Sequence, residues 1–467
     1  MDFFPGNAMT SISTTTESFE SMKIFVRHLL AGPADPDRDF TPGGRNYGAI
    51  YAMADGIRRE LPKTGAVCLL SDDPAVAAAA FLAALAGGVS LVIPYAVSRR
   101  AAEDIHREIP LSAAVAEDRE RAPEGVPAIV PSTGAAAPES VPAMTPGMGP
   151  DAPFLHFFTG GSTGRPRMWT KTPRNLLAEA RFQAGFHGIG PDDRILATVP
   201  PHHIYGFLFS VLVPFVASAS VAPEVFVFPE EIRDALVRYR PTIHVSVPVH
   251  YRILNGGGIP GESLRMAFSS AGRLAPEDAD YFHRETGVPL VEIYGSTETG
   301  GLAWRCRSRG ETELRPFEIV RWKVGADERL CVNSPFVGPD APRDAEGFFR
   351  TGDRVRILPQ GRWALLGRAD GIVKVGGKRV DLQRLEEALK GLPGVSDAVA
   401  ISLAADGGRE TEVFALVQTA ADPERLRAAL AERLEPHAMP RRIRVTDRIP
   451  VTASGKYDRP AIEALFP

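Results

Sequence analysis

The stretch that decides the fold covers residues 65–97 and reads GAVCLLSDDPAVAAAAFLAALAGGVSLVIPYAV. Its first part, 65–71, is a short apolar run with the length of a buried strand. An alanine-rich helical run begins at Pro74 and is ended by Gly87 and Gly88, and the strand SLVIP follows until Pro94 stops it. A strand, a helix and a second strand in this order predict parallel strands in an α/β core.

Residues 74–97 carry no charge, and this length can cross a bilayer. We favour the helix and strand of a soluble core, because alanine-rich sequence is a weak membrane former and the glycine pair ends the helix. The N-terminus has no basic segment followed by an apolar run, so it does not resemble a signal peptide. We therefore expect no membrane span.

The same alternation continues along the chain. Further buried strands are predicted at 194–200, 242–248 and 290–295, and helices at 47–61, 175–186 and 230–239. A low-complexity stretch at 122–153 is interpreted as a surface crossing or a flexible linker. These patterns predict an α/β fold with a large N-terminal domain of parallel or mixed sheets and helices, residues 1–369.

The pattern changes after Gly367. A hairpin is predicted at 371–381, then a helix at 382–392, strands at 395–402 and 412–418, and a second helix at 423–434. We predict a small C-terminal α+β domain, residues 370–467.

Charge and cysteine content exclude several classes of protein. Lys and Arg number 53 against 57 Asp and Glu, a net charge of −4, which argues against a dedicated nucleic-acid binder. The three cysteines are scattered without a CxxC pair, which excludes a disulfide scaffold and a recognisable zinc site and fits the reducing cytoplasm.

The strongest local motif is FFTGGSTGRPR at 157–167. Gly160, Gly161 and Gly164 let backbone N–H groups turn toward an anion, and three hydroxyl groups add donors. Arg167 adds a guanidinium that can hold phosphate oxygens in pairs. The loop is not a Walker loop, since no GK[ST] ends it. The hydroxyl donors are Thr159, Ser162 and Thr163.

Five later motifs complete a pattern. They are PPHHIYG at 200–206, YGSTETG at 294–300, TGD at 351–353, GRAD at 367–370 leading into VKVGGKRV at 373–380, and PVTASGKYDR at 450–459. Together and in this order, they resemble the adenylate-forming enzymes: acyl- and aryl-CoA synthetases, carrier-protein ligases, peptide-synthetase adenylation domains and luciferases. Within this superfamily, the chain resembles a stand-alone acyl- or aryl-acid AMP ligase.

The resemblance implies how ATP is held. The 159–167 loop would grip the β- and γ-phosphates, and Tyr294 would stack on adenine. Thr297 would donate to the α-phosphate, and Glu298 would hold Mg²⁺, which spreads phosphate charge. Further ATP or AMP contacts are expected at Ser270, Ala271, Gly272, Gly295 and Ser296.

Three later residues complete the implied reaction centre. Asp353 would accept hydrogen bonds from both ribose hydroxyls, and Arg368 would add a ribose or phosphate contact. Lys456 would bridge the substrate carboxylate and the α-phosphate, two anions that repel one another. Arg167 stands where the family usually has lysine, and Lys171, four residues on, offers an alternative cation.

The acid pocket would begin at His203, which matches the family's motif histidine. Amino-acid-activating relatives carry Asp at the next position, where this chain has Ile204. An apolar side chain cannot neutralise an ammonium group, so an amino acid substrate is not expected. The pocket residues are predicted to be His203, Ile204, Phe207, Val247 and Gly272. They favour an aromatic acid such as a hydroxybenzoate, with a fatty acid as the alternative.

The acceptor thiol is expected from outside the chain. Only 11 residues follow Lys456, and no phosphopantetheine attachment motif is present. CoA or a separate acyl carrier protein would supply the thiol, and Lys374, Gly376 and Gly377 would line its tunnel. By resemblance, the small domain is mobile and swings about Asp370 between the two half-reactions.

Two other functions stay open at this point. The first is an adenylate-forming enzyme with a non-thiol second step. The second is a non-catalytic relative that binds a nucleotide or acyl ligand, which is motivated by Arg167 and by a large domain that is short for the family. The expected substrates are ATP with Mg²⁺ and a small carboxylic acid, and the chain would be a monomer or a homodimer.

Overall fold

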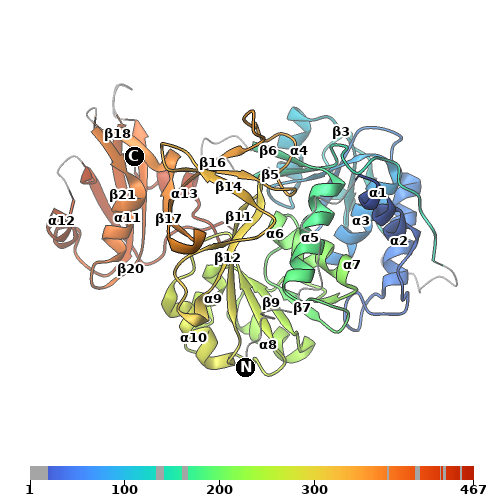
Figure 1. Cartoon of the computed structure of the whole chain (residues 1–467), viewed down its shortest axis with the longest axis horizontal. Coiled ribbons are helices and arrows are strands. Elements are labelled where there is room, and N and C mark those ends of the chain that lie inside the picture. Colours follow the sequence, from blue (N-terminus) through green and yellow to red (C-terminus); the bar gives the residue numbers. More distant parts are fainter. Residues whose placement is uncertain are drawn as a thin grey trace. The chain divides into compact units, whose positions relative to one another are not determined.

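The computed structural model describes residues 19–132, 141–159, 167–375, 378–404, 411–431, 433–434, 438–452 and 455–466. These residues form two compact units. Unit 1 comprises residues up to 321 together with 333–349, and unit 2 comprises 322–332 and 350–466. The units are described separately below (Figure 1).

Unit 1 contains a six-stranded sheet in the order β4-β3-β1-β2-β5-β6, parallel except for the pair β5 and β6. The strands are β1 (Ala66–Leu70), β2 (Ser90–Ile93), β3 (Leu111–Ala116), β4 (Ala128–Ile129), β5 (Leu155–Thr159) and β6 (Arg167–Lys171).

Helix α3 (Pro74–Gly87) connects β1 to β2 as the sequence predicts. The Asp73 side chain caps its first turn by accepting from the Ala75 N–H, and Gly88 ends it at φ 72°. The helix is buried from Pro74 to Leu85 because it lies inside the unit. Among the described residues, no helix has the length and apolar character needed to cross a membrane.

A seven-stranded sheet follows in the order β13-β12-β11-β10-β9-β7-β8, with β12 and β13 antiparallel to their neighbours. Its strands are β7 (Arg194–Ala197), β8 (Ser220–Val221), β9 (Ile243–Ser246), β10 (Met266–Ser269), β11 (Leu290–Ser296), β12 (Gly300–Cys306) and β13 (Arg315–Pro316).

Helices cover both sheets of unit 1, and α5 packs on α7 and on the π-helical turn 208–212 (Figure 1). The remaining helices of this unit are α1 (Phe19–Ala31), α2 (Tyr47–Glu60), α4 (Arg99–Glu108), α5 (Pro173–Phe186), α6 (Ile204–Phe207), α7 (Val213–Ala217), α8 (Pro229–Tyr239), α9 (Pro248–Ile253) and α10 (Pro276–Thr286).

The described parts of the low-complexity stretch pack on this unit. Ala128 and Ile129 add an edge strand to the first sheet, and Met144 is buried. The Gly147 N–H donates to the carbonyl of Leu85 at the end of α3. A Cβ on Gly147 would lie 2.5 Å from the Ala86 carbonyl oxygen, so only glycine permits this approach. These segments fit a surface crossing.

Unit 2 contains a four-stranded sheet, a hairpin and a three-stranded sheet with helix α11 (Leu382–Lys390) packed on β20 (Figure 1). Its strands are β14 (Arg321–Val324), β15 (Arg329–Asn333), β16 (Phe349–Ile357), β17 (Trp363–Arg368), β18 (Ile372–Val375), β19 (Lys378–Asp381), β20 (Val395–Ala404), β21 (Thr411–Thr419) and β22 (Arg442–Thr446). Its other helices are α12 (Pro423–Ala431) and α13 (Arg459–Glu463).

The predicted fold class is confirmed: a large N-terminal α/β part precedes a small α+β part. The compact units are divided differently from the predicted domains, because unit 2 also includes 322–332 and 350–369. The predicted boundary at 369/370 separates the parts that are expected to move relative to one another about Asp370. It stays a prediction.

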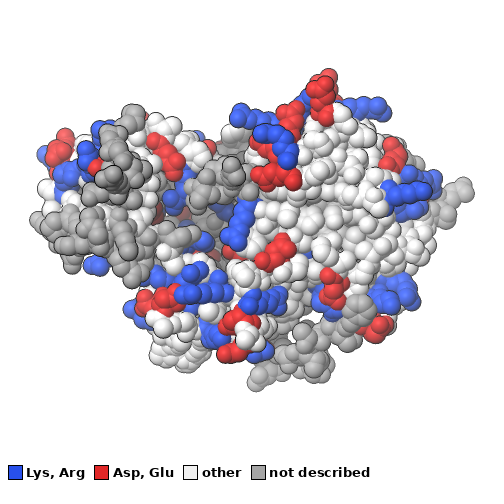
Figure 2. Space-filling model, turned by 90° about the horizontal axis from the view of Figure 1, so that it is seen from above, with Lys and Arg blue, Asp and Glu red and all other residues white. Residues whose placement is uncertain are grey.

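On the face drawn in Figure 2, the described Lys and Arg side chains are interspersed with Asp and Glu. This distribution is in keeping with the nearly balanced composition of 53 basic and 57 acidic residues.

Two buried histidines predict acid sensitivity of the fold. Burial lowers the pKa of His187 to about 3, and the positive charge of Arg265 lowers it further. Burial likewise lowers the pKa of His244 to about 3, with an additional electrostatic effect of His250. In the unfolded chain a histidine titrates near pH 6.5. The stability of the fold with neutral histidines at these two positions is therefore fully present above pH 6.5, and it is lost as the pH falls toward 3.

Between pH 7 and pH 5, each of these histidines should therefore lower the free energy of unfolding by about 2 kcal/mol. Urea unfolding at both pH values measures the loss. A His244→Phe variant, whose ring can still pack on Phe282, should lose about 2 kcal/mol less than the wild type. An identical loss in both proteins would contradict this prediction.

Candidate active site

The phosphate-loop motif lies on the hairpin formed by β5 and β6. Thr159 and Arg167 are paired residues at the ends of the two strands. The predicted loop residues Gly160, Gly161, Ser162, Thr163 and Gly164 lie outside the described residues. Arg167 is exposed, and its guanidinium carbon lies 4.1 Å from the centre of the Trp169 ring. The hairpin thus presents a cation beside the predicted anion loop.

Lys171 does not serve as the alternative phosphate cation. It is fully buried at the end of β6, and its Nζ donates to the carbonyl oxygens of Phe336 at 2.6 Å and Glu298 at 3.1 Å. Burial lowers its pKa to about 8, although Glu179 and Glu298 raise it. This ammonium group is therefore committed to main-chain carbonyls inside unit 1.

The predicted adenine residue, Tyr294, lies near the end of β11, and the predicted magnesium residue, Glu298, lies in the turn between β11 and β12. Ser296 and Thr299 close this turn through their hydroxyl groups, 2.8 Å apart, and the Ser296 N–H donates to the Thr299 hydroxyl. Tyr294, Thr297 and Glu298 are partly exposed, and Thr297 and Glu298 occupy the tip of the turn. The partly exposed carboxylate of Glu298 fits Mg²⁺, which proteins often bind through one or two carboxylates and the substrate's phosphates.

The neighbouring strand β10 leads into the 270–272 loop. The Ser270 hydroxyl donates to the carbonyl oxygen of Ile293 at 2.8 Å, which ties this loop to β11. Ala271 has φ 68°, an uncommon conformation for a residue with a side chain, and Ala271 and Gly272 are exposed. Since β10 and β11 are parallel neighbours, their carboxyl ends bring the 270–272 and 294–298 segments to one edge of the sheet.

The predicted acid-pocket residues follow β7, β9 and β10 of this sheet, and one of them, Phe207, packs against β5 of the six-stranded sheet. His203 precedes α6, and its ring centre is 4.3 Å from that of His202. Phe207 is fully buried, with its ring packed on Phe81 and Phe157. Its role as pocket lining stays a prediction, as do those of Ile204, which is partly buried, and Val247, which is buried before α9.

A histidine–carboxylate pair lies beside His203. The Nδ1 atom of buried His202 lies 2.6 Å from a carboxylate oxygen of Asp72, which follows β1. Gly206 lets the backbone after this pair fold tightly, because a Cβ there would lie 2.1 Å from the Pro200 carbonyl oxygen. His202 therefore has a defined structural partner.

In unit 2, the structure pairs Asp353, the predicted ribose ligand, with Arg368, which is predicted to contact the ribose or a phosphate. Asp353 and Arg368 are opposite residues of β16 and β17, with their side chains 3.7 Å apart. The Asp353 N–H donates to the Thr351 hydroxyl at 3.1 Å. A carboxylate and a guanidinium thus lie side by side on two paired strands.

Lys456 lies in a tight turn near the C-terminus. The Thr452 N–H donates to the Lys456 carbonyl at 2.7 Å, and Gly455 has φ 75°. The next residue, Tyr457, donates its hydroxyl to Asp397 at 2.7 Å and accepts from the Lys390 ammonium at 2.8 Å. This cluster anchors the backbone on one side of Lys456.

The anchoring predicts a selective effect of Tyr457→Phe. The variant keeps the ring and loses both hydrogen bonds to charged groups, so we expect adenylate formation to slow by about 3- to 10-fold. Transfer of a preformed acyl-adenylate to thiol should stay within about twofold of wild type, because in the predicted cycle Lys456 acts in adenylation. Rate measurements on each half-reaction test this, and an equal decrease in both would contradict it.

The predicted hinge and tunnel residues are only partly described. Asp370 lies in the short 3-10 turn Ala369–Gly371, and Lys374 is paired with Arg379 in the hairpin of β18 and β19. Gly376 and Gly377 lie outside the described residues.

Two family profiles match the chain: "AMP-binding enzyme" over residues 51–328, and "AMP-binding enzyme C-terminal domain" over residues 384–456. The first covers more than half of the chain. The chain belongs to the AMP-binding enzyme family.

Its relatives in this family include enzymes for different acids. A sulfoacetate–CoA ligase of Cupriavidus necator is 28% identical over 66% of this chain and 66% of its own length. A 3-hydroxybenzoate–CoA/4-hydroxybenzoate–CoA ligase of Thauera aromatica is 28% identical over 65% of this chain and 64% of its own length. The matches thus span just under two thirds of these relatives.

The crystal structure of ATP-bound MatB from Rhodopseudomonas palustris has the same fold. The TM-score is 0.79 at 20% identity, and the match covers 95% of this chain and 99% of that chain. At this identity the likeness concerns the fold.

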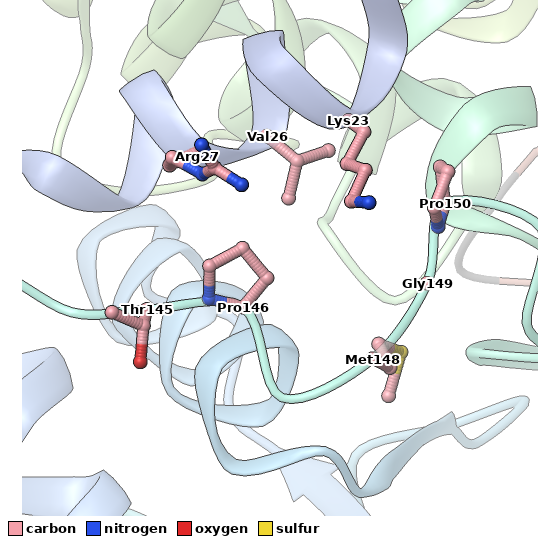
Figure 3. A pocket seen from close by; sticks show the side chains of 8 residues that line it. All are labelled: Lys23, Val26, Arg27, Thr145, Pro146, Met148, Gly149 and Pro150. Atoms are coloured by element: carbon pink, nitrogen blue, oxygen red, sulfur yellow. The ribbon is translucent and has the colours of Figure 1, made fainter. Parts of the chain in front are cut away.

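A groove of about 520 Å³ lies elsewhere on this AMP-binding family chain, between α1 and the segment 145–150 (Figure 3). Lys23, Val26 and Arg27 of α1 face Pro146 and Met148 across it (Figure 3). None of its lining residues belongs to the predicted site, so it is not assigned to ATP or acid.

The sequence interpretation missed the polar residues behind the Glu298 turn. Glu179 of α5 accepts the Gly301 N–H at 2.7 Å. Asn175, one helical turn earlier, instead donates to the Pro335 carbonyl at 2.7 Å, outside the Glu298 turn. The sequence did contain a signal for these residues. Polar side chains recur every four residues on a helix whose other residues suggest burial, and buried polar groups need specific partners.

Proposed function

We propose that this chain activates a carboxylic acid with ATP and transfers the acyl group to a phosphopantetheine thiol. The proposal rests chiefly on one arrangement: in an AMP-binding family chain, the turn with Thr297 and Glu298 is hydrogen-bonded to the end of the phosphate-loop hairpin through Lys171. This arrangement supports a site in which phosphate and metal ligands have fixed positions.

In the first half-reaction, a carboxylate oxygen attacks the α-phosphorus of ATP. The bond to the bridging oxygen breaks, pyrophosphate leaves, and an acyl-adenylate forms. We assign phosphate binding to the 159–167 loop, α-phosphate contact to Thr297 and adenine stacking to Tyr294. Mg²⁺ held by Glu298 would neutralise phosphate charge.

Three residues later in the sequence are proposed to supply the remaining groups. Asp353 would hold the ribose, Arg368 would contact the ribose or a phosphate, and Lys456 would bridge the carboxylate and the α-phosphate. Their local order supports these roles, because each is held on a strand pair or a closed turn.

In the second half-reaction, the thiol sulfur attacks the acyl carbon, the bond from this carbon to the AMP phosphate oxygen breaks, AMP leaves, and the thiol proton is released to solvent. CoA is the favoured acceptor because both relatives described above are named CoA ligases, and a separate acyl carrier protein is the alternative. The hairpin with Lys374, Gly376 and Gly377 would line the thiol's path after a swing about Asp370.

For the acid, we propose an aromatic carboxylate such as a hydroxybenzoate. Ile204 in place of a carboxylate disfavours an amino acid, and buried Phe207 and Val247 support apolar surroundings. The hydroxybenzoate ligase among the relatives supports this class, while the sulfoacetate ligase shows that the family accepts other acids.

Product analysis tests the proposal. The protein is incubated with ATP, Mg²⁺ and a panel of aromatic, fatty and amino acids, with or without CoA or a phosphopantetheinylated carrier protein. We expect AMP and an acyl thioester from one acid class, only in the presence of thiol. Formation of an amide or another non-thiol product would refute the proposed second step, and ATP binding without turnover of any acid would favour a non-catalytic role.

A further inference from the structure

A stripe of polar side chains begins at the end of β6 and continues along the buried side of α5. Its members recur every four residues and are all buried: Lys171, Asn175, Glu179 and Gln183. Residues four apart lie on one face of a helix, a face that is normally apolar when it is buried. A buried polar stripe therefore needs an explanation in terms of what it contacts.

Lys171 contacts the main chain of the proposed metal ligand. Its Nζ lies 3.1 Å from the Glu298 carbonyl oxygen and 2.6 Å from that of Phe336. The Glu298 carbonyl also accepts the Gly338 N–H at 3.1 Å. Two donors thus fix the backbone at the residue whose side chain we assign to Mg²⁺.

Glu179 fixes the other end of the same turn. Its carboxylate accepts the Gly301 N–H at 2.7 Å. Gly300 has φ 68°, and a Cβ there would lie 2.6 Å from the second Glu179 carboxylate oxygen. The carboxylate is therefore packed directly against the turn, with no room for a side chain between them.

A lysine at position 171 carries a desolvation penalty in the folded state, because its charge is removed from water. It is fully buried, and among the described residues its hydrogen-bond acceptors are main-chain carbonyls. Burial opposes its charged form and lowers its pKa. Since replacing buried charges by apolar side chains of similar size is often neutral or stabilising, packing alone does not account for a lysine here.

We propose that Lys171 and Glu179 are positioning residues that hold the 296–301 turn in register with the phosphate-loop hairpin for adenylation. Lys171 follows the loop by only a few residues on β6, so one short segment carries the phosphate loop and also holds the backbone of Glu298. This inference rests on the proposed function.

The test uses Lys171→Met in the full chain, which keeps an unbranched side chain shorter by one atom and removes the donor. Acid-dependent pyrophosphate–ATP exchange gives kcat and KM for the acid and for ATP. We expect kcat to fall by about 10- to 100-fold, as for loss of a charged hydrogen bond, with KM for the acid within about threefold. Glu179→Leu, which frees the Gly301 N–H, should show the same selective loss of kcat.

Asn175→Ala is the matched control. Asn175 caps α5 with Thr172 and binds the 335–337 carbonyls, so its loss destabilises the same helix without releasing the 296–301 turn. We expect a lowered Tm and an exchange kcat within about threefold of wild type. If activity followed Tm in all three variants, the positioning role would be refuted.

The outcomes separate the two proposals. Wild-type protein without acid-dependent exchange would refute the proposed function itself. Active wild type with unchanged kcat in folded Lys171→Met would refute the positioning role alone. If Lys171→Met does not fold, Glu179→Leu decides by the same criterion: a selective loss of kcat supports the role, and an unchanged kcat refutes it.

Discussion

A Lys456→Ala variant is expected to lose acid-dependent adenylate formation by about 100- to 1,000-fold, the usual effect of removing a donor from a developing charge. The ammonium group is proposed to join two anions, the carboxylate and the α-phosphate, whose repulsion otherwise opposes attack. Transfer from a preformed acyl-adenylate to thiol should be retained, because in the proposed cycle Lys456 leaves the centre before this step.

The two half-reactions are measured separately, by pyrophosphate exchange and by thioester formation from synthetic acyl-adenylate. Lys63→Ala, an exposed lysine before β1, serves as the control and should stay within about twofold of wild type in both assays. Equal loss of both half-reactions in Lys456→Ala would contradict the two-state cycle.

A Glu298→Gln variant is expected to lose pyrophosphate exchange by about 100-fold. The amide has the size of the carboxylate but no charge, so it holds Mg²⁺ poorly while the turn closed by Ser296 and Thr299 is retained. Increasing the Mg²⁺ concentration should restore part of the rate. This dependence on Mg²⁺ separates a metal ligand from a structural residue.

Glu277→Gln, an exposed carboxylate in the first turn of α10, is the control for this variant. It should leave both the rate and the Mg²⁺ dependence unchanged. Exchange within about threefold of wild type in Glu298→Gln would contradict the metal-ligand role.

Much of the fold was predictable from local pattern. The helix predicted at 47–61 is α2 at Tyr47–Glu60, and the strand predicted at 65–71 is β1 at Ala66–Leu70. Such elements are recognisable because burial imposes their period and Gly, Pro and Asn mark their ends. By contrast, β6 (RMWTK) and β12 (GGLAWRC) were not predicted, because their mixed sequences become strands through antiparallel pairing with β5 and β11.

Site prediction had a similar limit. Asp353 and Arg368 were predicted individually, and the strand register brings them together within unit 2. The sequence offered Lys171 as an alternative phosphate cation to Arg167, since a lysine beside a phosphate loop suggests that role. Its actual acceptors are main-chain carbonyls 127 and 165 residues away in sequence, which no side-chain pattern encodes.

The central claim, that this AMP-binding family chain adenylates a carboxylic acid, is tested most directly by exchange of labelled pyrophosphate into ATP. The assay is run with aromatic, fatty and amino acids in the presence of Mg²⁺, without thiol. The account predicts exchange that depends on the acid and is strongest with an aromatic carboxylate. Absence of exchange with every acid, in protein that binds ATP, would contradict it.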